Sequence, residues 1–437
     1  MKKINNSVLA LALFVGIANA NAQEKKTLTL DDAVQLGIQN SKNLKIDAAK
    51  IEEATANLLE AKNRQLPELK ISGSYMYLPL KPNIDIKLPG VSGAGGPEVH
   101  QVAYGSANVS VPIYSGGRIK YGIESAKYLV EASKLTTEND KVAIAYNVAQ
   151  AYNNLFKANQ SIKVLEENLT ASQKRDETFL KLENNGVIAR NDRLKASLQT
   201  SNIELQLLEA KNNYNIANIN MDLLLGLPET TEIEVDQNYI DEGNEVKPLD
   251  FYLNEARENR KDLQALDKQR QAAALGTKSA KAENLPSIAF TGGYVAADIP
   301  KFLTIYNAVN VGVGISYNLS NLWKENSSLK QSKAREMQLE ATNELLNDNI
   351  KLDVNREYQN TDYSKKRIAV FEKSAEQANE NYRITKNKYD NGLATMTELL
   401  DADAAQISAN VGVINAKADA ALAYRKLLQT TGTLTNK

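Results

Sequence analysis

The sequence of this chain contains an internal repeat, and this duplication limits the folds that it can adopt. Residues of the N-terminal half recur 219 positions later, in the pairs Leu30/Leu249, Asp31/Asp250, Asn40/Asn259, Leu44/Leu263, Leu66/Leu285, Pro67/Pro286, Gly73/Gly292 and Tyr75/Tyr294. Further along, the offset becomes 206, in the pairs Ser110/Ser316, Gly186/Gly392 and Gly226/Gly432. A repeat of about 200 residues is far longer than the units of solenoids. We therefore predict two similar lobes joined in one pseudo-symmetric chain.

The first 22 residues have the features of a secretory signal peptide. Lys2 and Lys3 precede an apolar stretch at 8–18, and the small residues at 20–22 resemble a cleavage site. That stretch is too short to cross a bilayer, and no later segment approaches 18 continuous apolar residues. We therefore predict an exported protein that starts at Gln23 and whose membrane part, if it has one, consists of β-strands.

The composition argues against most kinds of catalytic and metal-binding site. The chain has no Cys and a single His, His100, so it can build neither a thiol nucleophile nor a multi-histidine metal site. Its 52 basic and 53 acidic residues nearly balance, which gives no indication of a nucleic-acid partner. The glycines at 93–96 fit neither common phosphate-binding pattern. The sequence predicts a protein that is not an enzyme and uses no cofactor or metal.

Each repeat is predicted to contain a helix, two strands, a long helix, a short loop and a returning helix. The first repeat, residues 23–227, has a helix at 30–64, strands at 70–78 and 104–114, and helices at 119–184 and 188–226. The second repeat, residues 248–437, has a helix at 248–283, strands at 287–296 and 308–319, and helices at 324–390 and 394–430. Residues 228–247 are acidic and rich in turn formers, which predicts a linker with a short strand or helix.

The predicted strands alternate apolar and polar residues. Val309, Val311, Val313 and Ile315 alternate with small or polar residues, which is the period of a strand with one apolar face. A half-buried strand of a soluble sandwich has the same pattern. Tyrosines near the strand ends and the export signal favour an outer-membrane barrel instead. Four strands leave two open edges, and small barrels need about eight strands. Several copies of the chain are therefore expected to contribute their strands to one barrel.

The long helices indicate a rod or a tube. Apolar residues at 148, 152, 155, 162, 165 and 169 follow the heptad spacing of helices that pack along a seam. A helix of this length reaches roughly 100 Å. Glycines at 186 and 392 end the long helices, and each returning helix is little more than half as long as its partner. These helix lengths fit a cylinder wall in which continuous long helices alternate with pairs of shorter helices stacked end to end.

Four short motifs, in this order and partly duplicated, resemble the TolC-like outer membrane efflux proteins over essentially the whole mature chain. They are Leu28-Thr29-Leu30-Asp31-Asp32-Ala33, Leu66-Pro67, Val111-Pro112-Ile113-Tyr114-Ser115-Gly116-Gly117 and Leu224-Leu225-Gly226-Leu227-Pro228. The second repeat departs from the third motif and reads Asn318-Leu319-Ser320-Asn321-Leu322-Trp323.

This resemblance implies a mainly α fold with a small β part, in which a homotrimer shares a long antiparallel coiled-coil α-barrel and a 12-stranded transmembrane β-barrel. It implies a location in the cell outer membrane, in contact with its lipid and extending into the periplasm. The protein would be a passive exit channel of a tripartite efflux or type I secretion system. A periplasmic adaptor protein and an inner-membrane pump of the RND, ABC or MFS type would open it.

The resemblance also implies a periplasmic gate. Glu398 and Asp401, one turn apart, match the acidic residues that line the family's narrowest point, where rings of carboxylates attract cations. Asp192 and Tyr389 match a hydrogen-bonded gating latch. A second family latch uses an arginine where this chain has Ala394, so that link is expected to be absent, and Arg190 is a candidate substitute.

The loops at the helix tips are the expected adaptor contacts. Their small and apolar residues are Gly186, Val187, Ile188, Gly392, Leu393 and Ala394. The 13 residues by which the two offsets differ fall at 79–103, where length and proline content predict an extracellular loop, either disordered or partly plugging the barrel mouth.

One alternative function comes from a different class. The chain would then be an exported coiled-coil scaffold whose strands form a soluble β-domain, with no conduction. The two hypotheses differ in whether the apolar strand faces touch lipid.

Overall fold

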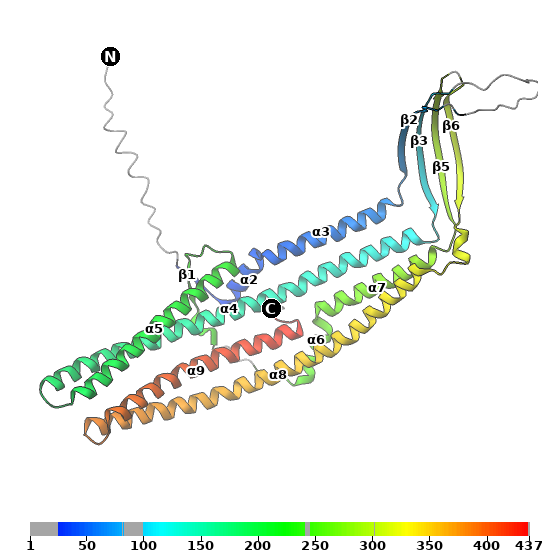
Figure 1. Ribbon diagram of the computed structural model, residues 1–437. Helices are drawn as coiled ribbons and strands as arrows, with labels where there is room; N and C mark the ends of the chain where they lie inside the picture. Colours follow the sequence, from blue (N-terminus) through cyan, green and yellow to red (C-terminus); the bar gives the residue numbers. More distant parts are fainter. Residues whose placement is uncertain (1–24, 81, 83–98, 241–244, 301, 436–437) are drawn as a thin grey trace, which may run out of the picture. The chain divides into compact units, whose positions relative to one another are not determined.

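The computed structural model describes residues 25–80, 82, 99–240, 245–300 and 302–435 (Figure 1). Within these ranges helices predominate over strands, as the sequence predicts. The predicted signal peptide at 1–22 and most of the predicted loop at 79–103 lie outside the described residues. None of the described helices combines the length and the apolar character that a membrane crossing requires.

The chain divides into two compact units, which are described separately. The first unit contains Met1–Ile46, Thr137–Lys261 and Asn347–Lys437, and the second contains Asp47–Thr136 and Asp262–Leu346. Two long helices, α4 (Arg118–Asn184) and α8 (Ser327–Asp390), contribute to both units. Their predicted bounds, 119–184 and 324–390, agree closely with these.

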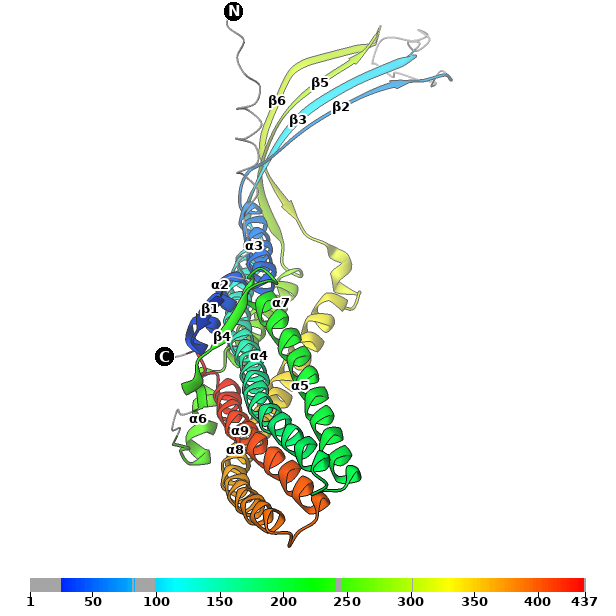
Figure 2. The same cartoon turned by 90° about the vertical axis from the view of Figure 1, so that its left-hand side faces the viewer.

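The second unit contains one antiparallel sheet (Figure 2). Its strands are β2 (Glu68–Tyr77), β3 (Gln101–Tyr114), β5 (Ser287–Ile299) and β6 (Leu303–Ser316), in the order β2-β3-β5-β6. All four predicted strands are present. However, β6 ends at Ser316, so the alternating residues 317–319 are not strand, and the 3-10 helix η2 (Leu319–Leu322) follows. The register of β3 shifts at Pro112, where a proline lacks the N–H that a ladder needs.

The outer strands of this sheet, β2 and β6, present apolar side chains to solvent. Each of the following side chains is at least 63% exposed: Leu69, Ile71, Val309, Val311, Val313 and Ile315. Edge strands carry unpaired N–H and C=O groups, and native proteins normally pair or cover an edge that is also apolar. Among the described residues, the sheet of a single chain is therefore open at both edges, and no other element of its own unit covers these apolar side chains.

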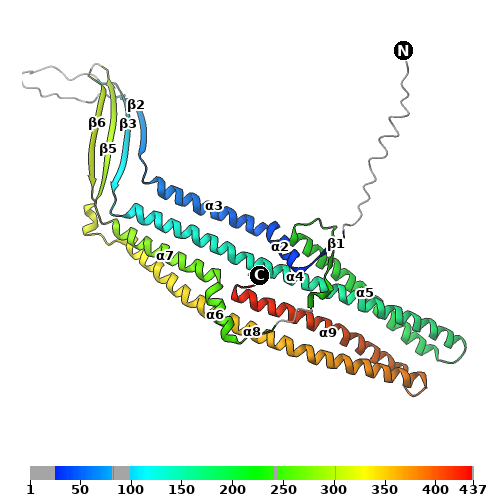
Figure 3. The same ribbon diagram turned by 180° about the vertical axis from the view of Figure 1, so that it is seen from behind.

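The first unit is built on two antiparallel helical hairpins (Figures 1 and 3). In the first hairpin α5 (Arg190–Leu225) returns along α4, and in the second hairpin α9 (Met396–Thr431) returns along α8. Ser172 and Thr200 share a hydrogen bond of 2.8 Å within the first hairpin. The returning helices were predicted to begin at 188 and 394, two residues too early, because the turns extend further than expected. Residues of the predicted seam on α4, such as Tyr152 and Leu155, are fully buried.

The prediction of one continuous helix at 30–64 and another at 248–283 is wrong, because a break divides each of them into two helices. These are α2 (Leu30–Asn40) with α3 (Lys42–Asn63), and α6 (Leu249–Asn259) with α7 (Lys261–Ala282). At the first break Asn40 Nδ2 donates to the carbonyl of Leu225 (2.7 Å), which attaches the end of α2 to the end of α5. Ser41 has a non-helical ψ of 122°, and the equivalent Arg260 has 115°. Neither proline nor glycine marks these breaks, so the sequence pattern alone did not predict them.

A small parallel pair of strands lies in the first unit, β1 (Lys25–Leu28) with β4 (Glu232–Val235). β4 and the 3-10 helix η1 (Gln237–Ile240) are the short elements predicted within the linker, whereas β1 was not predicted. The buried Tyr152 hydroxyl donates to the carbonyl of Leu28 (2.9 Å) and accepts from the N–H of Asp236 (2.7 Å). One side chain of α4 thus holds both segments against the hairpins.

Candidate functional site: the hairpin tips

The two hairpins end in turns of the same geometry. We call residues 185–189 the first tip and residues 391–395 the second tip. In each, a glycine takes a left-handed conformation that other residues adopt only with strain, with φ of +71° at Gly186 and +73° at Gly392. The N–H of Val187 donates to the carbonyl of Leu182 (2.9 Å), and that of Leu393 to Lys388 (2.8 Å). This is the Schellman arrangement that closes a helix C-terminus, and the ends of the long helices at these glycines were predicted from the sequence.

The predicted adaptor contacts divide into exposed and half-buried residues. Val187 and Leu393, at equivalent positions, are 66% and 77% exposed. Gly186 and Gly392 are also exposed, whereas Ile188 and Ala394 are half-buried. Two large apolar side chains directed into solvent at the ends of helices are the features expected of a docking surface. Their role as adaptor contacts remains a prediction.

A small apolar cluster holds the ends of the two hairpins together. Its buried members are Phe179 on α4, Ala196 on α5, and Met396 and Leu399 on α9. Tyr389 of α8 packs against Phe179, with ring centroids 5.9 Å apart. The cluster brings all four helices of the hairpins into contact, because each contributes at least one side chain.

The structure does not show the predicted latch, although Asp192 lies close enough to Tyr389 to act on it electrostatically. Burial raises the pKa of the Tyr389 hydroxyl, and the nearby carboxylates of Asp192 and Asp390 raise it further. Asp192 forms an ion pair with Lys195 (3.6 Å) on its own helix. Within the described part of the chain, no hydrogen bond joins Asp192 to Tyr389. The hydrogen-bonded latch therefore stays a prediction.

Glu398 and Asp401 lie at the start of α9, and both are exposed. The carboxylate of Glu398 accepts hydrogen bonds from the N–H (2.6 Å) and the hydroxyl (2.8 Å) of Thr395. Thr395 Oγ1 in turn accepts from the N–H of Glu398 (3.3 Å), which completes a capping box. These bonds from Thr395 lower the pKa of Glu398. Glu398 therefore has a structural task that we did not predict, although the Thr-x-x-Glu spacing was readable in the sequence.

A buried ion pair behind the tips was not predicted at all. Arg175 on α4 donates through Nη1 and Nη2 to the two carboxylate oxygens of Asp403 on α9 (3.0 and 3.1 Å). Nη2 also donates to the hydroxyl of Tyr382 on α8 (3.3 Å). The Arg175 side chain is 14% exposed and that of Asp403 is 5% exposed. Arg190, the candidate substitute for the missing arginine latch, is exposed instead.

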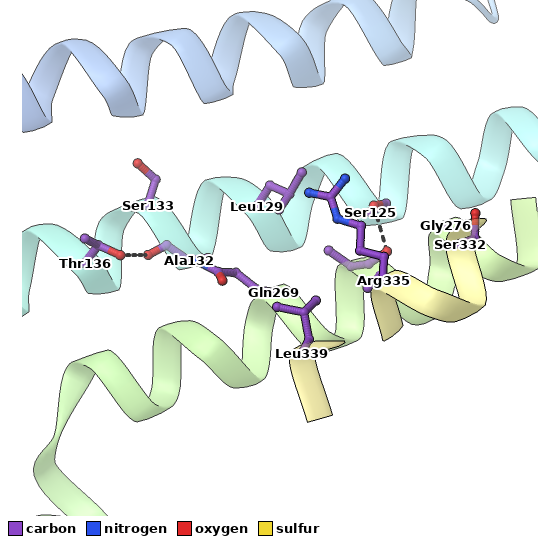
Figure 4. A pocket seen from close by; sticks show the side chains of 12 residues that line it. Ser125, Leu129, Ala132, Ser133, Thr136, Gln269, Gly276, Ser332, Arg335 and Leu339 are labelled. Carbon is purple, nitrogen blue, oxygen red and sulfur yellow. Dashed lines mark hydrogen bonds between the residues drawn. The ribbon is translucent and has the colours of Figure 1, made fainter. Parts of the chain in front are cut away.

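The described residues include no clustered metal ligands, and the cavities near them lie in the second unit. No group of three or more His, Cys, Asp or Glu side chains among them is arranged to hold a metal ion. Within the second unit, a cavity of about 480 Å³ lies between α4, α7 and α8 (Figure 4). Small side chains such as Ser125 and Ala272 line it, and its charged lining residue, Arg335, is exposed. The tips, where the predicted site residues gather, are the candidate site.

A family model for outer membrane efflux proteins matches the chain twice, over residues 33–227 and 252–433. The chain belongs to the outer membrane efflux protein family. One match falls within each predicted repeat, and together they cover most of the chain. Members of this family are outer membrane channels with an efflux role, located in the cell outer membrane and extending into the periplasm. The family consists of channel proteins rather than enzymes.

Solved structures of outer membrane channels share the fold. VceC of Vibrio cholerae is 17% identical with a TM-score of 0.77, over 92% of this chain and 96% of that one. CmeC of Campylobacter jejuni is 18% identical with a TM-score of 0.74, over 93% and 86%. MtrE of Neisseria gonorrhoeae, solved in an open state, is 18% identical with a TM-score of 0.73, over 93% and 89%. A comparison with curated proteins finds no match.

Proposed function

We propose that three copies of this chain form a passive exit channel of a tripartite efflux or type I secretion system. Each copy contributes four strands to a 12-stranded barrel in the outer membrane and four helical columns to a 12-helix tunnel in the periplasm. A periplasmic adaptor docks at the tips, and an inner-membrane pump of the RND, ABC or MFS type supplies the cargo and the energy. The channel itself performs no chemistry.

The observation that carries this proposal is the open sheet of the second unit. In the part of the chain that the structure describes, its four strands leave two edges unpaired, and the valines and isoleucines of β6 are exposed. Lipid does not tolerate unpaired backbone edges, so a membrane-embedded sheet of this kind must close into a barrel. Three copies of this chain related by a three-fold axis would pair each free edge with the edge of a neighbouring copy and so close the barrel.

The second tip supplies the proposed gate. In a trimer, the exposed carboxylates of Glu398 and Asp401 form acidic rings at the narrow end of the tunnel. Such rings attract cations and repel anions. The proximity of Asp192 and Tyr389 supports a latch between the hairpins that forms in the closed trimer, where a hydrogen bond of about 0.5–1.5 kcal/mol is weak enough to open when an adaptor docks.

The first test is single-channel conductance of the purified, detergent-extracted protein in a planar bilayer under a salt gradient. We expect a small, cation-selective conductance, because the closed tips restrict the flow and the acidic rings select its sign. Folded, reconstituted protein that never conducts would contradict the proposal.

A pair of arginine substitutions on β6 tests which face of the sheet touches lipid. Val313→Arg places a charge on the exposed apolar face and is expected to cost about 2–4 kcal/mol and to prevent membrane assembly. The matched control is Gly312→Arg, one residue away on the opposite face, where an added Cβ meets no atom within 4 Å. Assembly is measured as the fraction of the protein from outer membranes that runs as a trimer on gels of unheated samples and as a monomer after heating. Equal assembly of both variants would support the scaffold function instead.

A further inference from the structure

The ion pair between Arg175 and Asp403 connects the two hairpins at their most buried polar contact near the tips. Arg175 belongs to the first hairpin, whereas Asp403 and Tyr382 belong to the two helices of the second. The guanidinium donates to both carboxylate oxygens in a bidentate arrangement, which is directional as well as strong. Because the partners are 228 residues apart in sequence, the pair forms only when the hairpins lie against each other.

The pair lies close behind the proposed gate. Arg175 is nine residues before the end of α4, which is about 14 Å along the helix axis. Asp403 follows Asp401 by two residues, and this spacing turns the two side chains toward nearly opposite sides of α9. Accordingly Asp401 is exposed, while Asp403 is buried against α4. A movement of the second hairpin that displaces Asp401 from the tunnel axis must therefore also displace Asp403 from Arg175.

We propose that Arg175, Asp403 and Tyr382 form the lock that keeps the two hairpins of each protomer together in the closed channel. This inference rests on the proposed channel function. The lock does not involve the tip residues themselves, such as Ala394. It acts from inside the hairpin interface rather than from the tip, so adaptor contact at the tips is not blocked by it.

The burial of the pair makes the lock behave as a switch. Separating two buried partners in part leaves each charge desolvated and unpaired, which is unfavourable. Once the hairpins are far enough apart for water to enter, both charges are hydrated again. The intermediate positions are therefore the least stable, and the pair favours either a closed or an open state.

Other polar contacts between the hairpins are weaker or further away. Lys195 Nζ donates to Thr397 Oγ1 at 3.4 Å in an exposed position. Lys157 pairs with Asp419 at 2.9 Å, but these side chains are 27% and 32% exposed and lie further from the tips. Neither contact combines burial, two hydrogen bonds and proximity to the gate.

The test measures conductance of purified channels in planar bilayers without an adaptor. Asp403→Asn removes the charge and one acceptor at constant size, and we expect a several-fold larger conductance or frequent openings. Arg175→Lys keeps the charge but loses the bidentate hydrogen bonds to Asp403, so its conductance should lie between those of the wild type and Asp403→Asn. The matched control is Glu166→Gln, which breaks an ion pair of 2.9 Å with Lys211 inside the first hairpin and should leave conductance unchanged.

Trimer assembly and melting temperature are measured on the same samples. A merely structural pair would lower the melting temperature without raising the conductance of assembled trimers, and that result overturns the lock. If Asp403→Asn does not assemble, Arg175→Lys decides by the same criterion. If the wild type conducts and assembled lock variants conduct equally, the channel stands and the lock is wrong. If neither the wild type nor any assembled variant conducts, the channel function itself fails.

Discussion

The two tips have the same backbone but different charges. Both close their long helix with a left-handed glycine and the same pair of backbone hydrogen bonds. The helices that follow differ at equivalent positions, 206 residues apart. Position 189 is alanine and makes no side-chain cap, whereas position 395 is threonine and caps α9. Asp192 pairs with Lys195, but their equivalents, Glu398 and Asp401, are both acidic.

This difference shows that a duplicated turn can keep its geometry while its chemistry diverges. The left-handed glycine is required wherever the chain reverses in this way, so it is present twice. The charge pattern of the next helical turn is not fixed by this turn geometry, so it can differ between the tips. The first tip carries a neutralised pair and the second an acidic pair. On our proposal, only the second tip can therefore act as a cation-selective constriction.

The largest expected effect comes from giving the second tip the charges of the first. Asp401→Lys recreates the acid and base spacing of Asp192 and Lys195. We expect the cation selectivity to fall by up to about tenfold, because the carboxylate rings no longer concentrate cations. The measurement is the reversal potential under a salt gradient. Asp401→Asn is the control that removes charge without adding the opposite one, and it should give an intermediate value. Unchanged selectivity in both variants would show that Asp401 does not face the conduction path.

A smaller effect is expected when the cap is moved from one tip to the other. Thr395→Ala should destabilise the first turn of α9 by about 1 kcal/mol, the usual cost of losing an N-cap. Ala189→Thr should stabilise α5 by a similar amount, because its backbone (φ −72°, ψ 143°) is close to that of Thr395 (φ −83°, ψ 159°). Hydrogen exchange of peptides covering the two helix starts measures both. If Ala189→Thr leaves exchange unchanged, a missing hydroxyl is not what distinguishes the tips.

The smallest effect is a difference in acid sensitivity between the tips. Hydrogen bonds from Thr395 lower the pKa of Glu398 below its ordinary value of 4.5. A carboxyl whose pKa is lowered by folding stabilises the folded state above its ordinary pKa, and this contribution is lost as the pH falls through the lowered value. We expect hydrogen exchange at the start of α9, corrected for its intrinsic rate, to rise as the pH falls below 4.5. The start of α5 has no such side-chain cap to lose.

Glu398→Gln is the control for this acid sensitivity. The amide keeps an acceptor for the capping box but has no proton to gain, so the pH dependence at the start of α9 should disappear. An equal rise in this variant and in the wild type would assign the effect to another group.

Local patterns in the sequence predicted the element types and the turns. Alternating residues predicted the strands, heptad spacing predicted the long helices, and Gly186 and Gly392 marked the tips. These features depend on backbone sterics and on burial of one face, which act between neighbouring residues. The capping box of Thr395 and Glu398 belongs to the same class of signal, although we did not recognise it in advance.

Contacts between distant residues were not accessible in this way. At the break beside Ser41, Asn40 bonds to Leu225, and β1 pairs with β4 more than 200 residues later. The pairing of Arg175 with Asp403 has no local signature, because either residue alone is an ordinary charge on a helix. The duplicated sequence determined most of the helices and strands and the turns between the hairpin helices. Which of their side chains meet depended on how the folded helices pack, since burial and hydrogen bonding select partners by position in space and not by order along the chain.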